Sequence, residues 1–272
     1  MSNQCSACQN GVEKPMAFSM AFQPIVNVET CRVYAYEALV RGPRGESAYS
    51  VLSQVTDENR YAFDQTCRVQ AITLASRLGL VETGAKLSIN FLPGAVYSPA
   101  ACIRLTLETA EQVNFPKDRL IFEFTEAEQV SNPRHLHAIA REYHKHGFNI
   151  AIDDFGAGFA NLSLFADLPA NVLKLDMELI RTIHLRPKAQ ALVRAFSVLC
   201  TQFGILMVAE GIETVEEYTT LRECGVTLMQ GYLLAKPAFE RLPAFTLPHT
   251  AVASALPAAV LPPIFGTAAR HF

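Results

Sequence analysis

The sequence predicts an α/β fold, specifically a modified (β/α)8 TIM-like barrel with one antiparallel strand near the N-terminus. From Met16 onward, short β-rich runs alternate with amphipathic helical segments, and this alternation is typical of a parallel sheet. Eight candidate strands favour a closed barrel over an open doubly wound sheet, and 272 residues is close to the length typical of such barrels. No G-x-G-x-x-G follows the first strand, which argues against a dinucleotide-binding fold.

The expected strands are short runs bounded by polar residues or glycine. They cover residues 20–26, 32–40, 86–91, 119–125, 149–154, 171–176, 205–210 and 228–234. Between strands, residues 57–79 and 132–147 repeat apolar side chains at three- and four-residue spacing and end in glycine, as amphipathic helices do. Only "NVETC" joins the first two strands. Because this is too short for a helical crossover, these two strands should form an antiparallel hairpin.

The two ends of the chain differ in composition from the barrel, which we place at residues 18–241. Residues 1–17 have neither a basic n-region nor an apolar h-region, so they predict a disordered leader rather than a signal peptide. Cys5 and Cys8 in this leader form a lone CxxC, with no second pair at zinc-finger spacing. Residues 242–272 are rich in proline and alanine. They predict an irregular tail packed on the barrel or on a partner.

The composition also excludes several classes of partner. The formal net charge is −3, so the field of the whole chain should not attract DNA or RNA. No run of about 18 uncharged apolar residues precedes the tail, and no membrane span is therefore expected. The seven cysteines are an odd number and mostly scattered, which favours free thiols and a reducing cytoplasmic location.

Polar side chains stand at the carboxyl-terminal ends of the expected strands after the first. They are Glu37, Asn90, Glu123, Asp153 with Asp154, Lys174 with Asp176, Glu210 and Gln230. In a barrel these ends meet at one rim, where enzymes of this fold keep their active sites. Any one acid, such as Asp154 or Glu126, could equally cap a helix. A carboxylate or amide at the end of so many consecutive strands indicates a shared site.

Two neighbouring aspartates close the expected strand 149–154. In a regular strand Asp153 and Asp154 would point to opposite faces. Both can serve one site only if the strand breaks there, and the glycines of "FGAGF" permit that break. The sequence therefore predicts an irregular strand end at this position.

The chemistry of these side chains predicts a metal site. Five carboxylates and one Asn, without Cys or His, form an oxygen-only ligand set that suits Mg²⁺ or Mn²⁺. The acids exceed the needs of one ion, so Asp153 is expected to bridge two ions roughly 3.5–4 Å apart. Lys174 could hold the attacking water or stabilise the phosphorus centre. These residues predict metal-assisted hydrolysis of a phosphate ester, without naming the ester.

Ordered motifs along the chain then point to a family. "YEALVRG" (36–42) resembles the signature of the EAL family of cyclic di-GMP phosphodiesterases. Seven further motifs resemble those of the family in the same order: "FQPIV", "SINF", "FEFTE", "DDFGAGFANLS", "LKLD", "AEGIET" and "MQGYLLAKP". The resemblance spans residues 18 to about 240. It implies a barrel enzyme that cleaves one bond of cyclic di-GMP to give linear pGpG.

The resemblance also implies a role for each matching residue. Glu37, Asn90, Glu123 and Asp153 would bind the first metal, and Asp153, Asp154 and Glu210 the second. Lys174, with Gln230 nearby, would position the hydrolytic water, and Glu126 would anchor the loop after Asp153. Gln23 and Arg41 would contact the substrate phosphates and sugars.

The loop after the paired aspartates departs from the family pattern. Ala157 and Phe159 stand where the family frequently has threonine and tyrosine, so we expect an effect on the rate more than on activity itself. The alternative is a non-hydrolysing EAL receptor or interaction module that binds cyclic di-GMP. The resemblance further implies a homodimer and a part in controlling motility and biofilm.

Overall fold

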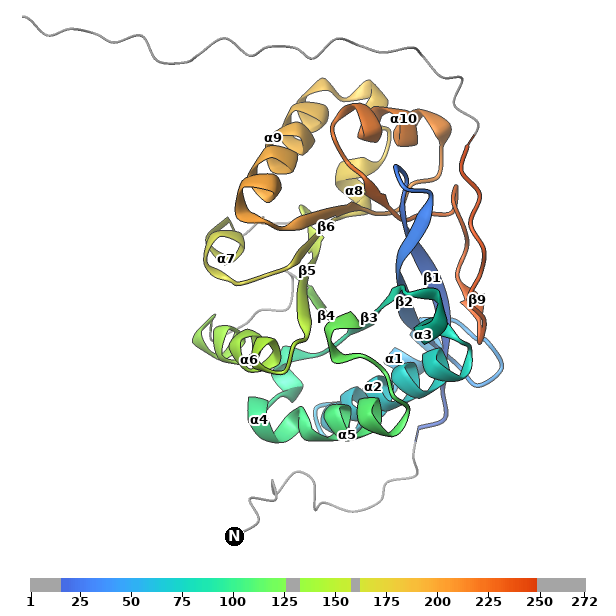
Figure 1. Cartoon of the computed structure of the whole chain (residues 1–272), viewed down its shortest axis with the longest axis vertical. Coiled ribbons are helices and arrows are strands. Elements are labelled where there is room, and N and C mark those ends of the chain that lie inside the picture. The colour runs from blue at the N-terminus through green and yellow to red at the C-terminus, as the bar shows by residue number, and fades with distance from the viewer. Residues whose placement is uncertain (1–15, 126–132, 158–161, 249–272) are drawn as a thin grey trace, which may run out of the picture.

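The centre of the molecule is a closed barrel of eight strands with helices around it (Figure 1). The computed structural model describes residues 16–125, 133–157 and 162–248. Strands β2 to β8 run parallel and follow one another in chain order around the barrel. Strand β1 lies between β8 and β2 and is antiparallel to both, which closes the barrel. The predicted fold class is confirmed.

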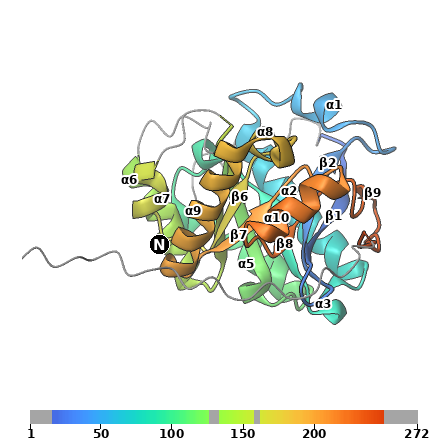
Figure 2. The same ribbon diagram turned by 90° about the horizontal axis from the view of Figure 1, so that it is seen from above.

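The barrel strands are β1 (Ser19–Asn27), β2 (Arg32–Arg41), β3 (Lys86–Asn90), β4 (Leu120–Thr125), β5 (Asn149–Phe155), β6 (Val172–Leu175), β7 (Leu206–Ala209) and β8 (Leu228–Met229). The longer helices are α2 (Arg60–Arg77), α5 (Arg104–Gln112), α6 (Pro133–Lys145), α9 (Pro187–Phe203) and α10 (Val215–Glu223). Short helices are α1 (Ala48–Leu52), α3 (Leu80–Thr83), α4 (Pro99–Cys102), α7 (Leu162–Asp167) and α8 (Met177–Ile180). Figure 2 shows the same helices surrounding the strands from a second direction.

Strands β1 and β2 form the antiparallel hairpin that the short connection predicted. Their register runs from Ser19 opposite Arg41 to Asn27 opposite Arg32, with one irregularity near Ile25. The Asn27 side chain stabilises the turn by accepting hydrogen bonds from the backbone N–H groups of the two residues Glu29 and Thr30. This register also sets Gln23 directly opposite Glu37, so the two polar side chains share one part of the barrel.

Apolar side chains divide between two clusters because strand residues alternate in direction. The smaller cluster is made of strand residues, one from each strand except β3: Ile25, Ala35, Ile121, Ala151, Val172, Val208 and Leu228. The larger cluster combines strand residues with residues of the surrounding helices. In β4, for example, Phe122 belongs to the larger cluster while its neighbours in sequence do not. Glu123 next to it is buried and polar.

The last part of the sheet differs from expectation. The expected strand 228–234 ends after Met229, although Gln230 N–H still donates to Ala209 C=O at 2.9 Å. The backbone then bends at Gly231, whose C=O accepts hydrogen bonds from the N–H groups of Leu234 and Ala235. An additional short strand, β9 (Ala238–Phe239), pairs with Ala21 and Phe22 of β1. The sequence analysis did not include this strand, since two residues are too short to show a periodicity.

The segment after β9 runs against the barrel as far as residue 248. Leu242, Phe245 and Leu247 pack on the larger apolar cluster, and Tyr36 Oη donates to Pro243 C=O at 3.1 Å. The leader up to residue 15, with Cys5 and Cys8, and the tail from residue 249 lie outside the described residues, so the domain boundaries stay predictions. No helix in the described part combines the length and the apolar character needed to cross a membrane.

Candidate active site

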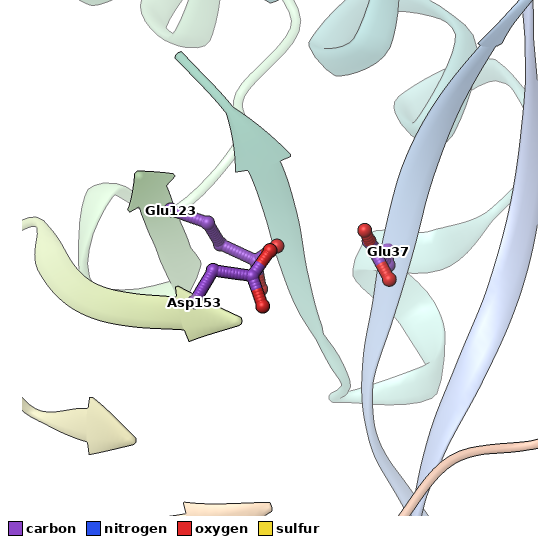
Figure 3. Close-up of side chains that lie close together, drawn as sticks. All are labelled: Glu37, Glu123 and Asp153. Atoms are coloured by element: carbon purple, nitrogen blue, oxygen red, sulfur yellow. The ribbon is translucent and has the colours of Figure 1, made fainter. Parts of the chain in front are cut away.

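The polar residues that end the strands converge at the carboxyl-terminal rim of the barrel. Figure 3 shows Glu123 of β4 and Asp153 of β5 side by side, with Glu37 of β2 facing them. Carboxylate oxygens of these three residues lie within 4.8 Å of one another. A second group with the same spacing consists of Asp153, Asp154 and Glu210. Asp153 belongs to both groups. We call these five residues the acidic cluster.

Lys174 of β6 lies among these carboxylates and is 1 % exposed. Its Nζ is 2.7 Å from Glu210 Oε1, 2.8 Å from Glu123 Oε2, 3.1 Å from Asp153 Oδ1 and 3.7 Å from Glu37 Oε2. Leu173 and Leu175, on either side in the strand, belong instead to the larger apolar cluster. Strand alternation therefore directs Lys174 inward while its neighbours pack outward.

A chain of hydrogen bonds holds Glu37 from both sides. Gln230 Nε2 donates to Glu37 Oε2 at 2.8 Å, and Asn90 Nδ2 donates to Glu37 Oε1 at 3.1 Å. Gln230 Nε2 is also 3.3 Å from Gln23 Oε1, while Gln23 Nε2 donates to Ala235 C=O at 3.0 Å. Side chains from β1, β2 and β3 and from the residue after β8 are thus connected at one rim, together with the backbone carbonyl of Ala235.

The end of β5 is irregular, as the adjacent aspartates predicted. Asp154 has a φ of 53°, a left-handed conformation that is uncommon outside glycine. The pairing with β6 shifts register between Ile152 and Phe155. Asp153 Oδ1 accepts a hydrogen bond from the Asp154 N–H at 2.9 Å, and Gly156 follows with a φ of 100°. This break brings both aspartates to the same site.

The site carries more negative than positive charge. Burial raises the pKa of Glu123 to about 8 even though Lys174 opposes the shift. Burial also raises the pKa of Asp153, raises that of Asp154 to about 6 with the Asp153 charge contributing, and raises that of Glu210 well above its usual value. Burial alone would lower the pKa of Lys174, but the surrounding carboxylates outweigh burial and raise its pKa well above normal.

The acidic cluster fits a divalent cation. Five carboxylates share one buried ammonium, so full ionisation of the cluster needs further positive charge. The Oε1 atom of Glu210 is buried and pairs with Lys174 Nζ at 2.7 Å, an ammonium that it shares with three other carboxylates. Gln230 Oε1 is buried and has no hydrogen-bond donor among the described residues. These carboxylate and amide oxygens, with no Cys or His among them, suit a hard divalent ion.

A cavity of about 290 Å³ opens beside the cluster. Its lining combines cluster and rim residues with the β6–α8 and β7–α10 connections: Gln23, Glu37, Asp154, Asp176, Met177, Glu210, Gly211, Glu213, Gln230, Gly231 and Tyr232. Met177 is 50 % exposed and Tyr232 is 56 % exposed. A polar floor with exposed apolar and aromatic side chains at its edge suits a ligand that has both charged and flat apolar parts.

Several expected residues take other positions or lie outside the structure. Asp176 lines the cavity but also caps α8, since its Oδ1 accepts from the Glu178 N–H at 2.7 Å. Arg41 lies at the end of β2, where its Nη1 donates to Val40 C=O at 2.7 Å, and it does not line the cavity. Glu126 and Phe159 lie outside the described residues.

Ser88 was missed by the sequence analysis. It is fully buried on β3, and its Oγ donates to Glu123 Oε1. The signal that could have found it is strand alternation, because Ser88 lies two residues before Asn90 and therefore on the same face. A small hydroxyl residue in a buried strand also needs a partner, and Glu123 provides one.

A family model for the EAL domain matches residues 7–237, which is most of the chain. The chain belongs to the EAL domain family. Among curated EAL relatives, the blue light- and temperature-regulated antirepressor BluF of Escherichia coli K12 is 31% identical over 230 residues, covering 84% of this chain and 56% of BluF. The cyclic di-GMP phosphodiesterase PA2567 of Pseudomonas aeruginosa is 28% identical, covering 81% of this chain and 38% of PA2567. The chain spans about half or less of the length of these relatives.

Solved EAL structures agree with the fold. A standalone EAL protein from Vibrio cholerae O395, in its c-di-GMP bound form, is 50% identical with a TM-score of 0.82, and the match covers 86% of this chain and 98% of that protein. BlrP1 of Klebsiella pneumoniae, in a manganese and cy-diGMP complex, is 33% identical with a TM-score of 0.78, over 84% of this chain and 58% of BlrP1. Another BlrP1 complex contains calcium.

Proposed function

We propose that this chain hydrolyses one phosphodiester bond of cyclic di-GMP to linear pGpG with the help of two divalent cations, Mg²⁺ or Mn²⁺. The observation that carries the proposal is the pair of three-carboxylate groups sharing Asp153 at the barrel rim. EAL relatives named as cyclic di-GMP phosphodiesterases, and EAL structures with this nucleotide and manganese or calcium, support it. The substrate of this chain is part of the proposal.

The ligand residues fall into two sets under this proposal. Glu37, Asn90, Glu123 and Asp153 would hold one cation, and Asp153, Asp154 and Glu210 would hold the other. The carboxylate groups that support these sets are described above. When bound, such cations activate water and neutralise charge on the phosphate oxygens. Metal binding would also restore the ionised state of carboxylates whose pKa burial raises.

Lys174 would hold the attacking water as a hydrogen-bond donor. The raised pKa of this ammonium keeps it protonated at neutral pH, so it positions the water and does not remove its proton. Gln230 would assist from the opposite side, since its amide already contacts Glu37. Gln23, which lines the cavity, and Arg41, at the end of β2, would bind the phosphates and sugars. Glu126 would anchor the loop after Asp153.

The alternative is an EAL module that binds cyclic di-GMP without cleaving it, or that binds a protein. Two observations favour keeping this alternative. Ala157 lacks the hydroxyl expected at this position of the loop, and one relative at 31% identity is named an antirepressor. The complete ligand set at the rim argues for the hydrolase, because a receptor has no need of two carboxylate groups that share Asp153.

The deciding experiment incubates the purified chain with cyclic di-GMP and either Mg²⁺ or Mn²⁺ and follows pGpG by ion-pair chromatography. We expect metal-dependent product, and a loss of about a hundredfold or more in Glu37→Ala. Glu82→Ala, an exposed carboxylate on α3, is the matched control and should keep full activity. Nucleotide binding without pGpG in the wild type would establish the receptor instead.

We also infer that the chain forms a homodimer through α7 and α9. Leu162 of α7 and Leu192 and Phe203 of α9 are each between 51 % and 58 % exposed, and helical spacing places Leu192 and Phe203 on one face of α9. Phe165 connects the two helices, with its ring 5.5 Å from that of Phe203. An apolar surface of this kind favours association. Light scattering should give twice the chain mass, and Leu192→Glu should give the monomer. The cytoplasmic location stays a prediction.

A further inference from the structure

A buried ion pair on α2 lies outside the acidic cluster and has no part in the chemistry above. Arg68 is 0 % exposed and Asp64 is 2 % exposed, and Arg68 Nη2 lies 2.8 Å from Asp64 Oδ2. Burying two charges is costly even when they pair, so a pair in this place needs a reason beyond stability. The contacts of this ion pair with the strands that carry Asn90 and Glu123 provide such a reason.

Asp64 holds the chain just after Asn90. Its second oxygen, Oδ1, accepts a hydrogen bond from the Leu92 N–H at 2.9 Å. The preceding N–H, of Phe91, donates to Glu123 C=O at 2.9 Å. The backbone that follows Asn90 is therefore fixed at two successive residues, once to α2 and once to β4.

Arg68 occupies a cage of aromatic rings. Its guanidinium carbon is 5.2 Å from the ring centre of Phe91, 5.3 Å from that of Phe122 and 5.7 Å from that of Tyr143. Its Nη1 donates to the Tyr143 hydroxyl. Its Nη2 pairs with Asp64 Oδ2, whereas its Nε makes no hydrogen bond with the described residues, so Asp64, Tyr143 and the aromatic faces hold the guanidinium. A flat guanidinium fits this cage and a lysine ammonium does not.

The cage touches the residues next to two proposed metal ligands. Phe91 follows Asn90 in sequence, and Phe122 precedes Glu123. Both rings belong to the larger apolar cluster, between the strands and the helices, and in β4 strand alternation turns Glu123 inward where Phe122 packs outward. A shift of the backbone that carries either ring would also move the adjoining ligand. Asn90 and Glu123 contact the remaining site through Glu37 and Lys174.

We infer that Asp64 and Arg68 are positioning residues that set the place of Asn90 and Glu123 for metal binding. This inference rests on the proposed function, in which both residues are ligands of one cation. The ion pair acts from outside the barrel wall: Asp64 sets the backbone after β3, and Arg68 sets the packing of β3 against β4 and α6. Neither residue contacts substrate or metal.

The test replaces the pair by apolar residues of similar size, Asp64→Leu with Arg68→Met. Paired replacement of this kind commonly preserves folding, whereas removing one partner leaves a buried charge. Mn²⁺ binding is measured by titration calorimetry without nucleotide, and turnover of cyclic di-GMP separately. We expect Mn²⁺ affinity to fall about tenfold or more and kcat to fall, with KM within threefold of the wild type.

Two further variants separate positioning from general loss of stability. Leu80→Ala forms a cavity at the amino-terminal side of β3, away from Asn90, and should keep wild-type Mn²⁺ affinity despite lower stability. Phe122→Leu removes one ring of the cage beside Glu123 and should weaken Mn²⁺ binding threefold or more. It decides the question if the double variant does not fold.

Unchanged Mn²⁺ affinity in Phe122→Leu, and in the double variant where it folds, would overturn the positioning role. A loss of affinity equal to that of a stability-matched Leu80→Ala would overturn it too. Wild-type protein that binds no Mn²⁺ would refute the metal site of the proposed function and this inference with it. Wild-type protein that binds Mn²⁺ but forms no pGpG would refute only the hydrolysis, and the affinity comparison would still decide the positioning role.

Discussion

Lys174→Met removes the ammonium around which four carboxylates gather in the metal-free protein. Methionine keeps most of the side-chain volume, so the change is chiefly one of charge. Lys174 is 1 % exposed, and no other cation of the described residues lies at ion-pair distance from these carboxylates. Removing one partner of a buried ion pair costs about 3–5 kcal/mol, because the remaining charge is left uncompensated.

For a chain of this size, 1 kcal/mol corresponds to a shift of about 2–4 °C in Tm. The expected drop in Tm for Lys174→Met without metal is therefore roughly 6–20 °C. Thermal unfolding is followed by circular dichroism at pH 8 with EDTA, and Lys188→Met, an exposed lysine of α9, serves as control. Mn²⁺ should raise the Tm of Lys174→Met more than that of the wild type, because bound cations replace the lost positive charge.

The pH dependence provides an internal check. At pH 5 the carboxylates with raised pKa values take up protons, so the difference between Lys174→Met and the wild type should narrow. A difference at pH 8 no larger than that of the control would refute the reasoning. It would mean that Lys174 does not compensate the charge of the acidic cluster.

Three further outcomes follow from individual contacts. In EDTA, the unfolding free energy of the wild type should fall as pH rises from about 4.5 to about 8, because the unfolded state releases the Glu123 proton at lower pH than the folded state does. Urea titrations at several pH values test this expectation. An unfolding free energy that does not change with pH would contradict it. Gly231→Ala should cost about 3 kcal/mol and displace the neighbouring rim, because its Cβ would overlap the backbone of Ile212. Gly94→Ala is the glycine control, because its Cβ would meet no atom closer than 3.8 Å. Thr214→Ala should cost about 0.5–2 kcal/mol in urea unfolding by removing the cap of α10, whereas Thr214→Ser should not.

Much of the fold could be predicted from local patterns. The alternation of strands and helices, the short connection after Asn27 and the glycine after each amphipathic helix depend on residues close in sequence. These local patterns can be recognised without knowing which distant residues they contact. Element ends were less predictable, because β8 ends after Met229, short of the expected end at residue 234, and β9 exists only by pairing with β1.

The candidate site was predictable to the extent that one polar residue follows each strand. Asp153, Asp154 and Glu210 lie together because parallel strands end at the same rim, and this topology follows from the alternation. The sequence analysis found neither the bond from Ser88 to Glu123 nor the aromatic cage of Arg68. Both join residues far apart in the chain, and no local pattern reports such a distance.

The sequence by itself determined the kinds of side chain at the rim, their order around the barrel and the break after Asp153. Only the tertiary structure decided how their charges interact. The raised pKa of Glu123, the burial of Lys174 among carboxylates and the pairing of Asp64 with Arg68 all depend on depth below the surface and on distances between atoms. Desolvation and Coulomb energies are functions of position in space, and residue identity alone does not specify that position.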